Sequence, residues 1–361
     1  MFRNAFHKKR VWLSGHTGFK GAWLAEWLLQ LGAEVYGFAL PPDTQPSLFE
    51  RLNLAHRIHH GLGDLRDRDA VRDSLLNVQP DFVLHLAAQP LVRKSYAYPV
   101  ETYQTNVLGT IHVLESLRSL QSACTAILVT TDKCYENREH GLPYNEEDHL
   151  GGRDPYSSSK AMAELAIAAY RQSFFGHQDS QIRIASARAG NVIGGGDWAE
   201  DRIVPDCIRA LRLGQPISVR NPTATRPWQH VLEPLSGYLW LAASLATSPK
   251  TPRAINFGPN PEANRSVGNL VAETLKHWPG SWQDASQSNA PHEAKLLSLS
   301  IEKARHLLRW APVWNFEPTI EKTISWYHRF EADPASAHQL TVSQIQGYLA
   351  DAMALNLPWT K

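Results

Sequence analysis

Short runs of apolar residues alternate along the first half of the chain with longer segments in which apolar residues recur at helical spacing. The expected strands cover residues 10–15, 34–39, 57–65, 81–88, 125–132 and 182–190. The expected helices cover residues 21–32, 100–120 and 156–174. Most of residues 81–88 is apolar, as a strand buried on both faces should be. This alternation predicts an α/β fold with a doubly wound parallel sheet and right-handed crossovers.

The pattern changes after Gly190, where the chain becomes rich in glycine, proline and polar residues. Helical periodicity returns at residues 203–214, 232–246, 300–310 and 319–330. Residues 253–258 are typical of one more strand, which we expect to return to the first sheet. The predicted organisation is a Rossmann-type domain of residues 1–190 plus about 231–258, with a smaller, interleaved C-terminal substrate-binding domain of residues 191–230 plus about 259–361.

Composition excludes several classes of protein. The formal net charge is +1, which gives no electrostatic argument for binding nucleic acid or a membrane surface. The longest apolar stretch, residues 237–246, has about half the length that spans a bilayer. Three cysteines cannot form a disulfide framework, so we expect a reducing, cytoplasmic environment. His56, His59 and His60 lack the spacing of zinc ligands, and no metal site is expected.

Three glycines follow the first expected strand and open the first expected helix. Gly15, Gly18 and Gly21 have the spacing at which a backbone closely approaches a pyrophosphate, and the helix N-terminus supplies free N–H groups. The pattern alone also fits a tight turn, but its position between strand and helix favours a dinucleotide.

One feature of dinucleotide sites is missing. The second expected strand ends at Ala39 and Leu40, where an acidic residue usually holds the adenosine ribose, and Asp43 is the nearest acid. No arginine lies there to take the extra phosphate of NADP, which favours NAD. Asp64, after the third strand, is placed either to meet the adenine amino group or to cap a helix.

A candidate catalytic group surrounds the next helix start. Tyr156 and Lys160 are four residues apart and share a helix face. An ammonium near a phenol favours the phenolate and brings the tyrosine pKa toward neutrality, so the pair suits proton removal from a sugar hydroxyl during hydride transfer. Thr131 ends the fifth strand, at the edge where such sheets bind ligands, and its hydroxyl can hold the same oxygen.

Several separate motifs now fit one known family. They are the three glycines, the HLAAQ segment from His85 to Gln89, Asn106, Thr131 and the Tyr156–Lys160 pair. Together they resemble the extended short-chain dehydrogenase/reductase family up to about Phe257. Residues 130–137, 186–206, 220–235 and 291–300 further resemble the CDP-glucose 4,6-dehydratases within that family.

The resemblance implies which residues hold the cofactor and which contact the substrate. It implies NAD, held by Gly15, Thr17, Gly18, Phe19, Gly21, Asp64, Leu65, Leu86, Ala87, Ala88, Asn106, Tyr156 and Lys160. It implies a CDP-sugar substrate, contacted by Gln89, Asn191, Arg202, Arg226 and His230. It also implies a homodimer in which the helix of Tyr156 pairs with the preceding helix. Cytosine specificity rests on the resemblance alone.

The implied chemistry is a redox-neutral dehydration catalysed by Thr131, Asp132, Lys133, Tyr156 and Lys160. Hydride leaves sugar C4 with Tyr156 as base, the ketone acidifies C5, water leaves from C6, and hydride returns to C6. Related dTDP-glucose dehydratases use an Asp-Glu pair where this chain has Asp132-Lys133. Asp132 suits the acid for the leaving hydroxyl, whereas Lys133 serves either as a neutral base or as a cation beside the enolate. The base at C5 therefore stays open.

Other interpretations compete with this one. Asp132 and Lys133 also fit a solvated ion pair at a strand end. An epimerase, or a dehydratase for another nucleotide sugar, has the same fold, but an epimerase needs no acid at C6. A non-catalytic dinucleotide sensor typically lacks the tyrosine-lysine pair, so Tyr156 and Lys160 argue against it.

Overall fold

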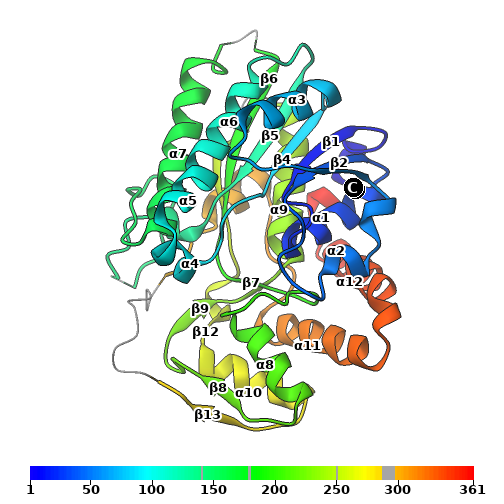
Figure 1. The fold of residues 1–361 in the computed structure, drawn as a ribbon, viewed down its shortest axis with the longest axis vertical. Helices are drawn as coiled ribbons and strands as arrows, with labels where there is room; N and C mark the ends of the chain where they lie inside the picture. The colour runs from blue at the N-terminus through cyan, green and yellow to red at the C-terminus, as the bar shows by residue number, and fades with distance from the viewer. Residues whose placement is uncertain (140, 178–179, 249–250, 287–296) are drawn as a thin grey trace.

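One parallel sheet forms the centre of the protein. The computed structural model describes residues 1–139, 141–177, 180–248, 251–286 and 297–361. Seven parallel strands lie in the order β11-β6-β5-β4-β1-β2-β3 (Figure 1). Their bounds are β1 Arg10–Ser14, β2 Glu34–Ala39, β3 His59–Leu62, β4 Phe82–His85, β5 Cys124–Val129, β6 Ile182–Ala189 and β11 Ala254–Phe257. The predicted α/β fold is confirmed, and the strand order reverses between β1 and β4, where open sheets bind ligands.

Helices cover both faces of this sheet and divide its core into two layers. On one face lie α1 Phe19–Gln30, α2 Leu48–Arg51, α9 Leu232–Thr247 and α12 Ala337–Ala354. On the other lie α3 Arg68–Val78, α6 Gly109–Leu117 and α7 Pro155–Ser173. Trp12 and Leu13 of β1 point to opposite layers, as alternate residues of a strand must.

The single helix expected over residues 100–120 is interrupted. It consists of α5 Pro99–Tyr103, a π-helical segment at Gln104–Leu108, and α6. The preceding α4 covers Val92–Ala97. Asn106 lies in the π-helical segment, and such insertions often occur where a helix serves a functional site.

A second group of elements lies beyond the carboxyl edge of the sheet, in the lower part of Figure 1. Its paired strands are β7 Val192–Ile193 with β10 Gln229–His230, β8 Ile217–Val219 with β13 Trp282–Asp284, and β9 Thr225–Pro227 with β12 Asn264–Ser266. Its helices are α8 Ile203–Arg212, α10 Val267–His277 and α11 Phe316–Ala332. The helix expected at residues 300–310 contains a π-helical segment, Ala304–Leu308.

The end of the chain returns to the first domain. Strand β11 pairs with β6, so the expected return of residues 253–258 to the sheet is confirmed. Helix α12, however, packs against α1 and α2, and the Arg3 N–H donates to the Lys361 carbonyl at 3.0 Å. Helix α12 also packs against α11, so the end of the predicted second domain, residues 191–230 plus about 259–361, contacts both groups of elements, and its boundary stays a prediction. Residues 291–296 of the fourth resemblance segment lie outside the described residues.

Three negative findings concern the described part of the chain. Cys124, Cys134 and Cys207 are all free and buried. Within the described ranges, no helix combines the length and hydropathy that a membrane span needs. The same residues contain no group of three or more histidine, cysteine, aspartate or glutamate side chains arranged to hold a metal.

Candidate active site

Helix α7 begins directly at the predicted catalytic tyrosine. Asp154 caps the helix by accepting the Ser157 N–H at 2.9 Å, and Pro155 occupies the first turn, where its missing N–H costs nothing. Tyr156 and Lys160 then lie one turn apart and both are buried. The local sequence therefore fixes the tyrosine at the beginning of a rigid helix.

The phenol of Tyr156 is less acidic than the sequence predicted. Burial raises the pKa of Tyr156 to about 12, against a hydrogen bond with Thr131 that lowers it. The predicted shift toward neutrality is wrong for this state, because the Lys160 Nζ donates to the Val129 carbonyl at 3.3 Å and the phenol is desolvated. Burial also lowers the pKa of Lys160 to about 8, against the attraction of Glu164.

A short 3-10 helix, Asp132–Cys134, follows β5, and Thr131 is its N-cap. The Thr131 hydroxyl donates to Asp132 Oδ1 at 2.9 Å, and Lys133 Nζ lies 3.8 Å from the same oxygen. Asp132 is almost fully buried, and its Oδ2 has no hydrogen-bond partner among the described residues. A Cβ at Gly190 would lie 2.8 Å from that oxygen, so glycine leaves room for the carboxylate. A buried acid with an unused oxygen suits proton transfer better than a solvated ion pair.

A buried ion pair lies beneath Lys160 and was not predicted. Arg188 of β6 donates to the Glu164 carboxylate at 2.7 Å, and the Thr130 and Ser186 hydroxyls donate to it as well. Burial alone would raise the pKa of Glu164, but Arg188 and the hydroxyl donors together lower it. The carboxylate thus remains charged one turn beyond Lys160. The only sequence signal for this ion pair was Glu164 itself, an acidic residue within the apolar segment of α7.

The glycine-rich turn between β1 and α1 has the shape of a pyrophosphate cradle. Gly15 has φ +77°, and a Cβ there would lie 2.8 Å from the Ala87 nitrogen. A Cβ at Gly21 would lie 2.0 Å from the Gly15 carbonyl oxygen, so the turn closes only with glycine. Gly18 is the N-cap of α1 and provides no capping side chain, which leaves the first N–H groups of the helix for an anion.

The neighbouring cofactor candidates mainly build this turn. The Thr17 hydroxyl donates to the Leu40 carbonyl at 2.9 Å, joining the turn to the end of β2. Ser14 accepts the N–H groups of Leu86 and Ala87, each at 3.1 Å, and so fixes the segment after β4. These contacts hold the carboxyl ends of β1, β2 and β4 together.

Three further candidates lie along the same edge. Phe19 begins α1 and its ring approaches Gly194, where a Cβ would be 3.2 Å from the ring. Leu65 is buried, and a Cβ at Gly109 would lie 2.8 Å from its side chain. Ala88 is partly exposed in the segment after β4.

Asp64 is engaged with a neighbouring arginine. Its carboxylate accepts the backbone N–H of Arg66 at 2.9 Å and its Nε at 2.8 Å. The alternative interpretation of Asp64 as a helix cap is wrong, because α3 is capped by Asp67, which accepts the Ala70 N–H. Asp64 remains at the carboxyl edge, but its charge is already paired.

Gln89 and Asn106 hold one another rather than an open space. Asn106 accepts the Gln89 N–H at 2.8 Å and donates to its carbonyl and to the Ser159 hydroxyl. The Gln89 amide accepts the Leu91 N–H at 2.7 Å and donates to the Thr102 hydroxyl at 3.0 Å. Both residues therefore position the loop after β4 against α7.

Of the predicted substrate ligands, Arg202 has an electrostatic link to the catalytic group. Tyr156 is one of its electrostatic neighbours, and Asp197 pairs with it at 2.8 Å. The buried Asn191 Oδ1 has no partner among the described residues. Arg226 lies in β9 and donates to the Thr225 carbonyl at 2.8 Å.

His230 is not accessible to a substrate in this structure. Its side chain is fully buried and packs edge-on against Trp23 and Trp314, with ring centroids 5.9 and 4.9 Å away. Its Nδ1 accepts the Leu232 N–H at 3.3 Å. The prediction of His230 as a substrate ligand is therefore not supported, because the ring joins α1 to the C-terminal segment.

A third lysine near the catalytic residues was also missed. The Lys20 Nζ donates to the Tyr238 hydroxyl at 3.2 Å, and its electrostatic neighbours are Arg202, Lys160 and Asp132. One feature of the sequence pointed to Lys20. It is a charged residue between Gly18 and Gly21, in a segment whose glycines let the backbone approach a pyrophosphate.

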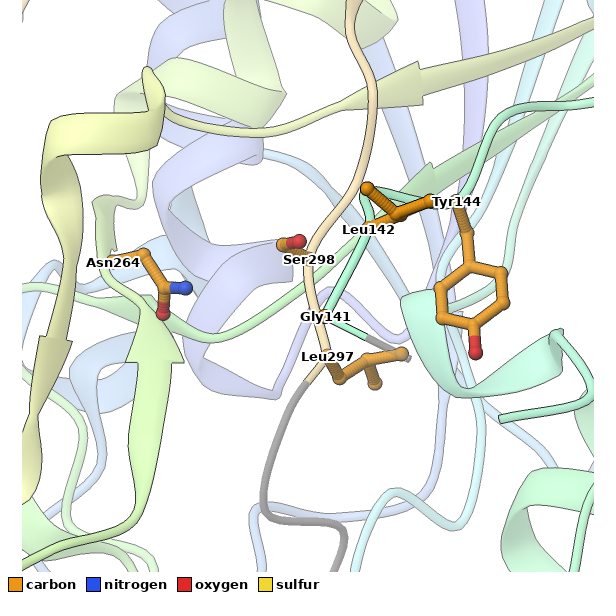
Figure 2. Close-up of a pocket in the computed structure, with 6 residues that line it drawn as sticks. All are labelled: Gly141, Leu142, Tyr144, Asn264, Leu297 and Ser298. Carbon is orange, nitrogen blue, oxygen red and sulfur yellow. The ribbon is translucent and has the colours of Figure 1, made fainter. Parts of the chain in front are cut away.

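A small surface pocket lies elsewhere. It is lined by Gly141, Leu142, Tyr144, Asn264, Leu297 and Ser298, where the Tyr144 N–H donates to the Ser298 carbonyl at 2.9 Å (Figure 2). Figure 2 shows the Tyr144 ring directed away from Asn264. None of the predicted site residues lines this pocket, so the candidate chemistry stays with the carboxyl edge of the sheet.

Comparisons with known proteins identify the family of the chain. Residues 13–323 match the family model described as GDP-mannose 4,6 dehydratase. CDP-glucose 4,6-dehydratase from Salmonella typhimurium is 45% identical over 331 residues, which cover 90% of this chain and 92% of that protein. UDP-glucuronic acid decarboxylase 1 from Xenopus tropicalis is 28% identical over 333 residues, 89% of this chain and 73% of that protein.

Solved structures share the fold. UDP-glucose 4-epimerase from Thermotoga maritima, determined with UDP-glucose, has a TM-score of 0.77 at 19% identity and covers 90% of this chain and 100% of its own. dTDP-glucose 4,6-dehydratase from Bacillus anthracis, determined with NAD, has a TM-score of 0.73 at 18% identity, with coverage of 91% and 99%. The resemblance inferred from the sequence motifs is confirmed, and the chain belongs to the family of GDP-mannose 4,6-dehydratase-like nucleotide-sugar enzymes.

Proposed function

We propose that the chain is an NAD-dependent CDP-glucose 4,6-dehydratase, a lyase that converts CDP-D-glucose into CDP-4-dehydro-6-deoxy-D-glucose and water. The observation that carries the proposal is the buried Asp132 beside Thr131 and Tyr156, because loss of water needs an acid that an epimerase does not need. The 45% identity with the Salmonella typhimurium dehydratase across nine tenths of the chain supports the same substrate.

The glycine-rich turn fits a dinucleotide. Gly15 and Gly21 have no room for a Cβ, and Gly18 leaves the N-terminus of α1 without a side-chain cap, so a pyrophosphate has both space and N–H donors. Gly15, Gly18 and Gly21 would hold the pyrophosphate of NAD, which would supply reversible hydride transfer for sugar C4 and C6. The absence of an acidic residue or an arginine at Ala39 and Leu40 favours NAD over NADP.

Tyr156 acts in the first step by accepting the proton of the C4 hydroxyl, while Thr131 holds the same oxygen. The raised pKa of Tyr156 means that its phenol gives up a proton only when a neighbouring group compensates the charge. Lys160, one turn away, supplies that compensation, and Glu164 with Arg188 keeps it in place. Asp132 then donates a proton to the hydroxyl that leaves C6.

The diphosphate of the substrate is held by cationic and amide side chains of the second domain. Arg202 and Arg226 suit its two negative charges, and Asn191 has a buried amide oxygen that lacks a partner among the described residues. Gln89 acts indirectly, by holding the loop after β4.

The enzyme is proposed to work as a homodimer in the cytoplasm. Leu108, Met162 and Leu165 are 47, 46 and 58% exposed on the π-helical segment and α7, two elements that pack against each other. A second copy of the same helices would cover them with matching apolar surface. The three free, buried cysteines fit a reducing compartment.

A substrate panel tests the function directly. The purified protein is incubated with CDP-glucose, dTDP-glucose, UDP-glucose and GDP-mannose, and the alkali-induced absorbance of a 4-keto sugar is measured. We expect the signal with CDP-glucose alone. A signal with another nucleotide sugar would make the protein a dehydratase of different specificity, and a C4 epimer without a 4-keto product would make it an epimerase.

A further inference from the structure

Position 133 leaves the proposed reaction without an obvious base for C5. Its Nζ lies 3.8 Å from Asp132 Oδ1, and as an ammonium beside the acid that serves C6 it has no lone pair with which to accept a proton. Lys160 donates to the Val129 carbonyl and is needed by Tyr156. The elimination therefore needs another group that can accept a proton at the carboxyl edge of the sheet.

Lys20 is such a group. It lies in the first turn of α1, and its Nζ donates to the hydroxyl of Tyr238, which projects from α9 on the same face of the sheet. The amine also lies 5.4 Å from the centre of the Tyr238 ring. Its hydrogen-bond acceptor is a neutral phenol, so no carboxylate partner holds it as a cation. The residue keeps part of its surface exposed, while protein atoms surround the amine itself closely enough for burial to affect its pKa.

The charged neighbours of Lys20 favour its neutral form. Arg202 and Lys160 are both cations, and Asp132 is the one acid among its main electrostatic neighbours. The pKa of Lys20 is lowered to about 7, mainly by burial. The positive charges of Arg202 and Lys160 lower it further, whereas the negative charge of Asp132 raises it. Helix α9, which carries Tyr238, packs against β5, the strand that ends just before Thr131 and Asp132. Tyr156 and Asp132 are also electrostatic neighbours of the Tyr238 phenol, so the amine lies on the side of the sheet where the groups that act on C4 and C6 are found.

We propose that Lys20 is a further catalytic residue, the base that removes the proton from sugar C5 during loss of water. The inference rests on the proposed dehydratase function. The lone pair of the neutral Lys20 amine takes the C5 proton, and the electrons of the C5–H bond form the C5–C6 double bond. The C6–O bond breaks as Asp132, which enters this step as a carboxylic acid, gives its proton to the leaving hydroxyl and becomes a carboxylate. One water molecule leaves, and no oxidant or reductant is consumed in this step. Lysine serves as a carbon base in other enzymes that abstract protons beside a carbonyl or carboxylate.

Single-turnover reactions of the NAD-loaded protein with CDP-glucose in D₂O test this role. The absorbance of reduced nicotinamide reports oxidation at C4, and mass spectrometry reports the 4-keto product and its deuterium at C5. We expect Lys20→Met to form reduced nicotinamide at the parent amplitude and to make product at least about 100-fold more slowly. Lys20→Arg should fail in the same way, because a guanidinium keeps its proton. The matched control is Lys276→Met, at an exposed position of α10, which should behave as the parent.

Three outcomes would overturn the assignment. Product formation by Lys20→Met within about tenfold of the parent would mean that another group is the base. Product at the parent rate from Lys20→Arg would mean that only the positive charge matters. Loss of reduced nicotinamide in both variants would place Lys20 in cofactor binding or oxidation. If the parent itself makes no 4-keto sugar from CDP-glucose, the proposed function fails first, whatever Lys20 does.

Discussion

The Arg188 guanidinium donates to the Glu164 carboxylate at 2.7 Å, and both side chains are at most 4% exposed. The pair lies one turn of α7 beyond Lys160 and ties that helix to β6. A buried carboxylate in this position supports a catalytic ammonium without touching the substrate, since its charge opposes the loss of the Lys160 proton on burial.

Removing one partner of this pair should destabilise the protein strongly. We expect Glu164→Ala to lower the free energy of unfolding by about 3–5 kcal/mol, because it leaves Arg188 charged, buried and unpaired. Denaturant unfolding at neutral pH measures the change. Glu302→Ala is the matched control, since Glu302 pairs with Arg305 on the surface and should cost at most about 1 kcal/mol. Equal effects of the two substitutions would contradict a structural role for the buried pair.

The phenol of Tyr156 should matter for chemistry more than for binding. Tyr156→Phe removes only the hydroxyl of a buried side chain, so we expect turnover to fall about 10²–10⁴-fold while the affinity for the CDP-sugar changes little. Steady-state assays of the 4-keto product and calorimetric titration with the nucleotide sugar check the two halves of this expectation. A loss below about tenfold would assign the base role to another group.

Glu233 should make stability depend on pH. Burial raises the pKa of Glu233 from 4.5 to about 7, against hydrogen bonds from Trp314, Tyr348 and Val313 that lower it. Because the folded state holds this proton more tightly than the unfolded state, its contribution to stability is present at low pH and is lost as pH rises from about 4.5 to about 7.

The Glu233→Gln variant carries no titrating group at this position, so it should lose that part of the pH dependence. Its amide can still accept the Trp314 N–H, which the carboxylate accepts at 2.7 Å. Denaturant midpoints measured at several pH values in this window, for parent and variant, provide the comparison. Parallel curves for the two proteins would contradict the raised pKa.

Oligomerisation should depend on the exposed face of α7. We expect the parent to sediment as a dimer at micromolar concentration and Leu165→Glu to sediment as a monomer, because a charge at a residue 58% exposed in one copy would be buried between two. Leu213→Glu is the matched control, since Leu213 is 70% exposed next to α8 and should leave the assembly intact. A parent that sediments as a monomer would contradict the proposed dimer.

The sheet and the glycine turn were predictable because their signals are local. Hydrophobic periodicity located the strands, and the positions of Gly15 and Gly21 followed from backbone sterics that any chain of this fold must obey. The π-helical segment at Gln104–Leu108 was not predictable, because apolar residues keep helical spacing on each side of it and a single inserted residue carries no sequence signal of its own.

The electrostatics of the site depended on contacts that sequence spacing cannot reveal. The pair Tyr156 and Lys160 predicted a lowered tyrosine pKa, but burial of the phenol opposes that effect and wins. Glu164 and Arg188 are 24 residues apart, and Lys20 and Tyr238 are 218 apart, so neither contact has a local signature. His230 was misread because a histidine within a polar loop gives no sign of being buried between Trp23 and Trp314.

Asp132 should act only after the first hydride transfer. Oxidation at C4 requires Tyr156, Thr131 and Lys160. The leaving hydroxyl at C6 requires a proton, and Asp132 has a buried carboxyl oxygen without a partner among the described residues.

Asparagine at position 132 retains the shape and can still accept the Thr131 hydroxyl, but it cannot donate an acidic proton. We therefore expect Asp132→Asn to form reduced nicotinamide in a single turnover with CDP-glucose and to stall before the 4-keto product appears. Rapid-mixing absorbance together with quenched-flow product analysis separates the two steps. Product at the parent rate, or a folded variant that binds NAD yet forms no reduced nicotinamide, would place Asp132 outside the elimination and leave the acid for C6 to be found among its neighbours.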